Sequence, residues 1–177
     1  YCAQKVLGYG GKVITMSDSG GYIFDKEGIN ESKLDWIMDL KNNRRGRIKE
    51  YVKEYPGAVY HEGKRPWGEV CDVALPSATQ NEIEVEGATN LVKNGCMAIS
   101  EGANMPTSPE AYTILSDAGV LFGPAKAANA GGVAVSALEM SQNASFDEWT
   151  SKKVDSKLDQ IMTGIHKQCA DAAEEYN

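Results

Sequence analysis

The sequence lacks the residue spacings that most metal and disulfide sites require. It has only two histidines, and none of its four cysteines lies in a CxxC pair. Structural zinc sites and redox-active dithiols need such closely spaced ligands, so we predict no metal site. We expect the cysteines to be small thiols in a reducing, cytoplasmic compartment. They are Cys2, Cys71, Cys96 and Cys169.

Long hydrophobic runs and an excess of basic charge are also missing. No apolar stretch approaches the roughly 18 residues that span a bilayer, so we predict no membrane partner, and we expect no secretory signal peptide. Lys and Arg total 18 against 25 Asp and Glu, a net charge of −7, which argues against nucleic-acid binding. Arg44, Arg45 and Arg47 form a local basic run, which is either a phosphate contact or a solvated helix end.

The glycine-rich phosphate fingerprint G-x-G-x-x-G is absent as well. Gly8, Gly10 and Gly11 imitate it, but they follow an expected helix and precede an expected strand. That order is the reverse of the one the fingerprint requires, so these glycines are rejected as a phosphate loop.

What the sequence does contain is an alternation of short apolar runs with helical periodicity. This alternation predicts an α/β chain with a doubly wound, mostly parallel sheet. The expected strands are 12–16, 58–60, 70–75, 96–99 and 119–122, with a turn at 18–21. The expected helices are 1–7, 30–43, 82–94, 109–118, 132–145 and 154–176, and the polar, charged sequence after residue 43 is expected to continue as helix to 55.

Small, hydrogen-bonding residues follow four of the expected strands, those ending at 16, 75, 99 and 122, at the edge where such sheets bind ligands. Asp18 occupies the position that often binds the adenosine ribose, or else it serves only as a turn residue. Asn129 opens a helix whose backbone N–H groups point toward an anion, or else it is an ordinary helix cap.

Six sequence blocks, in order and along nearly the whole chain, resemble the hexameric glutamate dehydrogenases of the Glu/Leu/Phe/Val dehydrogenase family. They are Ser17-Asp18-Ser19, Pro66-Trp67-Gly68, Ala74-Leu-Pro-Ser-Ala-Thr-Gln-Asn81, Glu101-Gly-Ala-Asn-Met-Pro-Thr107, Lys126-Ala-Ala-Asn-Ala-Gly-Gly-Val133 and Leu138-Glu-Met-Ser-Gln-Asn143. The first block is more similar to the NADP-dependent members than to the NAD-dependent ones.

The resemblance implies that residues 1–177 are most of a Rossmann-like coenzyme domain. It also implies that the domain's first strand, its glycine-rich loop and the N-terminal substrate domain lie outside this chain. The family's catalytic lysine and aspartate belong to that substrate domain, so we predict no catalytic residue here. Because the first strand is central in this fold, we expect the isolated chain to be unstable or to aggregate, and to lack turnover.

The resemblance also implies roles for individual residues. Ser17 and Asp18 are expected at the adenosine ribose and, in NADP-dependent members, at its 2′-phosphate. A carboxylate there is unfavourable without a nearby cation, and Lys26 is a candidate. The other implied cofactor-binding residues are Ala78, Thr79, Asn104 and Asn129. The implied substrate-binding residues are Val133 and Ser136, the serine bonding to the γ-carboxylate.

The activity implied by the resemblance is the reversible oxidative deamination of L-glutamate to 2-oxoglutarate and ammonia. The cofactor would be NADP, and the full-length protein would be a homo-hexamer. Two alternatives stay open: an NAD-dependent glutamate dehydrogenase, and a non-catalytic nucleotide-binding module of the same fold.

Overall fold

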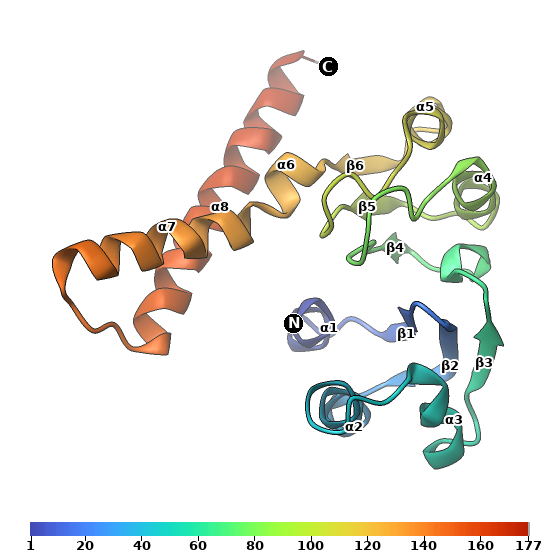
Figure 1. The fold of residues 1–177 in the computed structure, drawn as a ribbon. Coiled ribbons are helices and arrows are strands. Elements are labelled where there is room, and N and C mark those ends of the chain that lie inside the picture. Colours follow the sequence, from blue (N-terminus) through green and yellow to red (C-terminus); the bar gives the residue numbers. More distant parts are fainter. Residues whose placement is uncertain (177) are drawn as a thin grey trace.

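The computed structural model describes residues 1–176, which form two three-stranded sheets with helices packed around them (Figure 1). In the first sheet β1 (Val13–Asp18), β2 (Gly21–Ile29) and β3 (Val59–Glu62) pair antiparallel in that order. In the second sheet β4 (Val73–Ala74), β5 (Ala98–Ser100) and β6 (Leu121–Gly123) pair parallel in that order. The α/β class and the parallel arrangement of the second sheet are thus confirmed.

The expectation of parallel pairing does not extend to the first sheet. The predicted turn at 18–21 is present, but the chain returns directly along β1 as β2, a strand that the sequence reading missed. Gly21 permits the return because its φ of +146° is unfavourable for other residues, and a Cβ there would overlap the carbonyl oxygen of His61. A strand joined to its neighbour by so short a turn can only pair antiparallel.

The first sheet is packed against α1 (Cys2–Gly8), α2 (Glu31–Asn42), the 3₁₀ turn η1 (Ile48–Glu50) and α3 (Tyr51–Glu54). Asn30 caps α2 by accepting a hydrogen bond from the backbone N–H of Lys33 at 3.0 Å, as its residue type favours. The buried apolar side chains are Ile23, Ile29, Leu34, Ile37, Ile48, Tyr51 and Ala58.

A buried ionic cluster accompanies this apolar core. Asp25 of β2 is only 2% exposed and accepts hydrogen bonds from Lys33 Nζ and the Tyr51 hydroxyl, each at 2.7 Å. Burial by itself raises the pKa of Asp25, but these bonds and the Lys33 charge lower it below its usual value. The carboxylate therefore stays charged inside the fold.

The prediction that the helix starting at Asn30 continues to Tyr55 is wrong for residues 43–47, which are not helical. Helix α2 ends at Asn42, and the next helical turn does not begin until Ile48. Arg45 adopts a left-handed φ of 54°, and the Gly46 N–H bonds back to the Leu40 carbonyl at 2.9 Å. This turn directs the chain back toward the end of β1.

The parallel sheet is covered by α4 (Val85–Lys93) and α5 (Pro109–Asp117). Ser108 caps α5 by accepting from the Ala111 N–H, and Pro109 suits the first helical position. Apolar side chains from these helices and strands make a second core, formed by Ala74, Ile83, Ala88, Leu91, Cys96, Ile99, Ala111 and Leu115.

A short segment around the 3₁₀ turn η2 (Pro66–Gly68) connects the two units. Trp67 Nε1 donates to the Glu82 carbonyl at 2.6 Å, and Asn94 Nδ2 donates to the Gly68 carbonyl at 2.8 Å. On the other side, the Tyr22 hydroxyl donates to Glu69 at 2.6 Å. The segment is thereby bonded to both units.

The chain ends in α6 (Ala125–Ala128), α7 (Ala130–Ser145) and α8 (Ser151–Tyr176). Helices α7 and α8 pack against each other and extend away from α4 and α5 (Figure 1). The predicted continuous helix through 154–176 is confirmed, and the expected helix 132–145 begins two residues earlier. No helix within residues 1–176 is long and apolar enough to cross a membrane.

Candidate functional site

Asp18 lies at the carboxyl end of β1, and its carboxylate is fully engaged by the protein. One oxygen accepts the Gly20 N–H at 2.9 Å. The other accepts the Ile48 N–H at 2.9 Å and forms an ion pair with Lys41 Nζ at 3.0 Å. Burial by itself raises the pKa of Asp18, but the backbone bonds and Lys41 lower it below its usual value. Its negative charge is therefore present at neutral pH and is balanced by Lys41.

The cation beside Asp18 differs from the one expected. Lys26 lies well along β2, away from the turn where Asp18 pairs with Gly21, and its carbonyl accepts from Lys12 Nζ. Lys41 occupies the role proposed for Lys26, so that prediction is wrong. Lys41 is 23 residues from Asp18 in the sequence, and no local pattern points to the pairing.

One arginine of the basic run also reaches this turn. The exposed Arg47 donates from Nη1 to Ser19 Oγ at 2.7 Å. Arg44 instead pairs with Asp39 at 2.8 Å and lies over the Trp36 ring. Ser17 is exposed beside Asp18. This turn therefore presents two hydroxyls and a guanidinium to solvent, while its carboxylate is neutralised from within.

A second group of predicted residues gathers where β4 and β5 end. The Pro76 carbonyl accepts the N–H groups of Gly102 and Ala103 at 2.9 and 3.1 Å, which ties the two loops together. Gly102 allows this approach, because a Cβ there would lie 2.6 Å from Ser77 Oγ. The buried Glu82 accepts the Ala78 N–H at 2.9 Å and so fixes the turn that carries Ala78 and Thr79.

Glu101, which the sequence reading did not select, joins the ends of β5 and β6. Glu101 is only 5% exposed. Its two carboxylate oxygens accept hydrogen bonds from the N–H groups of Thr107 at 3.1 Å and Ala125 at 2.8 Å. Hydrogen bonds between a carboxylate and buried amides are among the stronger ones. The loop that carries Asn104 is fixed by Glu101 at one of its ends.

Asn129 closes this second group from the other side. Its Nδ2 donates to the Ala103 carbonyl at 2.9 Å, and it makes no side-chain capping bond to α7. The interpretation of Asn129 as an ordinary helix cap is therefore wrong. Further along α7, Val133 is 76% exposed, and the exposed Ser136 donates to the Gly132 carbonyl at 3.3 Å.

The predicted cofactor-binding residues thus form two clusters along the carboxyl ends of the strands, while Val133 and Ser136 lie apart from both, on the exposed side of α7. Ala78, Asn104 and Asn129 belong to loops that are hydrogen-bonded to one another, while Ser17 and Asp18 lie at the end of the other sheet. Among the described residues, no direct hydrogen bond links the Asp18 turn to the loops after β4 and β5.

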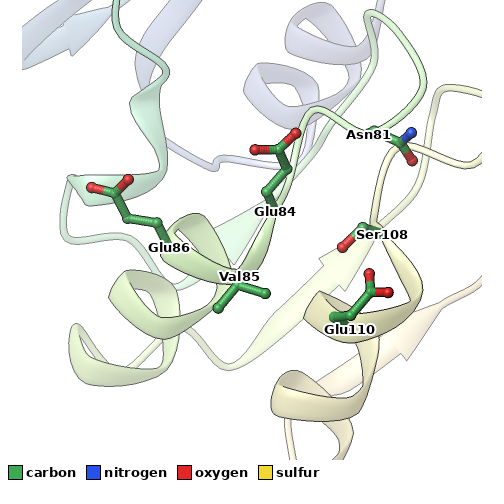
Figure 2. Close-up of a pocket in the computed structure, with 6 residues that line it drawn as sticks. All are labelled: Asn81, Glu84, Val85, Glu86, Ser108 and Glu110. Atoms are coloured by element: carbon green, nitrogen blue, oxygen red, sulfur yellow. The ribbon is translucent and has the colours of Figure 1, made fainter.

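A separate hollow lies where α4 and α5 begin (Figure 2). Three carboxylates line it, those of Glu84, Glu86 and Glu110, together with Asn81 and Ser108. Acidic side chains at helix N-termini already satisfy the partial positive charge there. This hollow is therefore unsuited to a phosphate, and within residues 1–176 no cluster of side chains could hold a metal ion.

Comparison with known proteins identifies relatives across the whole chain. The family model for Glutamate/Leucine/Phenylalanine/Valine dehydrogenase matches residues 1–177. The chain is 57% identical over 169 residues to a glutamate dehydrogenase of Bacteroides thetaiotaomicron, and 52% identical over 169 residues to an NADP-specific glutamate dehydrogenase of Haemophilus influenzae. These alignments cover 96% of this chain but only 38% and 37% of the relatives, so the chain spans less than two fifths of their length.

Solved structures show the same relationship. The fold matches that of Plasmodium falciparum glutamate dehydrogenase with a TM-score of 0.94 and 45% identity, over 99% of this chain and 38% of that one. A second glutamate dehydrogenase of the same organism gives a TM-score of 0.91 at 47% identity, over 99% and 39%. The Rossmann-like assignment is consistent with these neighbours.

Proposed function

Since this chain belongs to the Glutamate/Leucine/Phenylalanine/Valine dehydrogenase family, we propose that its protein catalyses the reversible NADP-dependent oxidative deamination of L-glutamate to 2-oxoglutarate and ammonia. Several relatives support this reaction and cofactor by name, including the NADP-specific enzymes of Haemophilus influenzae and Escherichia coli. The relative from Xylanibacter ruminicola is called NAD(P)-specific. Cofactor choice therefore has to be argued from this chain's own residues.

The contacts at the turn that follows β1, at Asp18 and Ser19, are the observation that supports NADP over NAD. A free carboxylate at this position would repel a 2′-phosphate. Here the Asp18 charge is balanced by Lys41 at 3.0 Å, and the Arg47 guanidinium stands next to Ser19. Arginine and hydroxyl donors are the groups that bind phosphate oxygens. The turn therefore fits a phosphate that NADP has and NAD lacks.

The remaining predicted residues would hold the other parts of the cofactor and the substrate. Ala78 and Thr79 would meet the ribose and pyrophosphate, and Asn104 and Asn129 the nicotinamide half. Val133 and Ser136 would contact the substrate, the serine at its γ-carboxylate. Bound NADP supplies the hydride acceptor, and these residues orient it against the substrate. In this proposal they bind and position, and the chemistry of proton transfer belongs to the substrate domain.

The architecture of the complete protein is proposed on the same family basis. Residues 1–177 would be part of the coenzyme domain, joined to a substrate domain, and the protein would be a homo-hexamer. All four cysteines are free thiols, which supports a reducing compartment such as the cytoplasm. Sedimentation analysis of the full-length protein tests the hexamer.

The experiment that tests the reaction and the cofactor compares two basic residues in the full-length protein. Arg47→Ala removes a phosphate contact, so kcat/KM with NADP should fall by about 10- to 100-fold, as expected for losing one charge-assisted hydrogen bond, while kcat/KM with NAD stays unchanged. Lys26→Ala, the matched control from β2, should change neither value.

Equal losses with both cofactors in the Arg47 variant would refute the phosphate contact. A wild-type protein that turns over glutamate only with NAD would favour the NAD-dependent alternative. A protein that binds NADP without oxidising glutamate would favour the non-catalytic module.

A further inference from the structure

Cys71 and Cys96 lie side by side where two neighbouring parallel strands begin. The register pairs Val73 with Ala98, so counting back two residues on each strand places Cys71 opposite Cys96. The Asp72 carbonyl accepts the N–H groups of Met97 and Ala98 at 2.8 and 3.2 Å, which continues the strand pairing toward the two cysteines. Adjacent strands are about 4.8 Å apart, within the Cα separation that a disulfide bridges.

The surroundings of the two thiols differ. Cys96 is 5% exposed and part of the second core, while Cys71 is half-buried and packs against that core. Cys96 Sγ lies 3.7 Å from the Asp72 carbonyl oxygen. Cys71 is therefore the thiol that a soluble reagent reaches first, and Cys96 is the thiol held behind it.

We propose that Cys71 and Cys96 are an oxidisable pair that closes to an intrachain disulfide across β4 and β5 when the protein meets a soluble low-molecular-weight disulfide. Neither thiol takes part in the proposed reaction, because both precede their strands while the cofactor residues follow them. The inference therefore does not depend on the proposed function.

The chemistry is two successive thiol–disulfide exchanges. The Cys71 thiolate attacks one sulfur of the reagent, forming a mixed disulfide and releasing one reagent thiol. Cys96 then attacks the Cys71 sulfur of that mixed disulfide, forming the Cys71–Cys96 bond and releasing the second reagent thiol. The two cysteines lose two electrons and two protons, which the reagent disulfide takes up as it becomes two thiols.

The environment sets how fast this exchange runs. Burial, the neighbouring Cys96 and the nearby Asp72 raise the pKa of Cys71 to about 12. Because the thiolate is the nucleophile, the pair is slow to react at neutral pH. Below this pKa the thiolate fraction rises about tenfold with each pH unit, and the rate of closure should follow it.

The test treats the full-length native protein with oxidised glutathione at several pH values, stops the reaction with an alkylating agent and maps the peptides by mass spectrometry. The expected product is a Cys71–Cys96 linked peptide pair, lighter by two hydrogens than the reduced pair, whose formation accelerates about tenfold per unit from pH 7 to pH 9. Cys71→Ala should abolish the link and leave Cys96 as a free thiol. The matched control Cys2→Ala, at an exposed cysteine distant in sequence from both thiols, should leave the link unaffected.

Two results would overturn the proposal. One is a fully oxidised sample in which glutathione sits on Cys71 but no linked pair forms, because this would show that Cys96 cannot reach it. Another is closure that proceeds only after the protein unfolds in denaturant.

Discussion

Replacing Glu101 tests whether one buried carboxylate holds together the loops after β5 and β6. In Glu101→Ala the N–H groups of Thr107 and Ala125 lose their acceptor. A buried unsatisfied donor costs about 1–3 kcal/mol. Thr107 is buried, with 6% exposure, so its unsatisfied N–H should cost the full amount. Ala125 is partly exposed, so its N–H can form a hydrogen bond to water instead.

The expected total is about 2–4 kcal/mol in the free energy of unfolding, or roughly 30- to 1,000-fold in the equilibrium for local opening. Urea denaturation of the full-length protein measures the first quantity. Hydrogen exchange of peptides that contain Thr107 and Ala125 measures the second. Because these loops carry Asn104 and adjoin Asn129, KM for NADP should also rise.

Glu110→Ala is the matched control, since Glu110 is an exposed glutamate in the first turn of α5. Its loss removes only a favourable interaction with the helix dipole, worth about 0.3–1 kcal/mol. If Glu101→Ala were no more destabilising than Glu110→Ala, with unchanged exchange at both amides, the assigned role of Glu101 would be wrong.

Two further predictions concern the first sheet. Gly21→Ala should lower the free energy of unfolding in urea by at least about 2 kcal/mol, because Gly21 has a positive φ and an added Cβ would overlap the His61 carbonyl oxygen. The control Gly57→Ala has open space around the added Cβ and should stay within about 1 kcal/mol of wild type. Similar values for the two variants would refute the strain assigned to Gly21. Asp18 and Asp25 have pKa values lowered in the fold, so their stabilisation is complete above the unfolded value of about 3.9 and is lost as the pH falls through the folded values. Urea denaturation between pH 3 and pH 7 should show a free energy of unfolding that declines below about pH 4–5, and a flat profile there would contradict the lowered values.

Much of the second unit follows from local sequence. Apolar runs and turn residues marked β4, β5 and β6, and three- and four-residue spacing from Val154 to Tyr176 marked α8. These features depend on neighbours in the chain. The positions of Ala78, Asn104 and Asn129 at strand ends followed from the general geometry of parallel sheets and from the family resemblance.

The first unit was harder because its determinants are distant in sequence. Strand β2 contains Asp25, Lys26 and Glu27, a charged run that does not look buried. Asp25 is accommodated only because Lys33 and Tyr51 come from other elements to meet it. The Lys41 and Ile48 contacts of Asp18 and the bond from Ala125 to Glu101 likewise join segments far apart in the chain. The pattern of a single sequence does not reveal such pairs.

The bonding of Asp18 has a consequence for anyone redesigning cofactor preference. The residue at this strand end is the obvious target for exchanging NADP for NAD, yet its carboxylate joins the hairpin turn, α2 and η1 through Gly20, Lys41 and Ile48. Substitution there would damage folding along with recognition, so a library randomised at Asp18 should return mostly insoluble variants. The exposed side chains of Ser19 and Arg47 hydrogen-bond to each other, and a redesign that leaves Asp18 untouched and varies these two would separate specificity from stability.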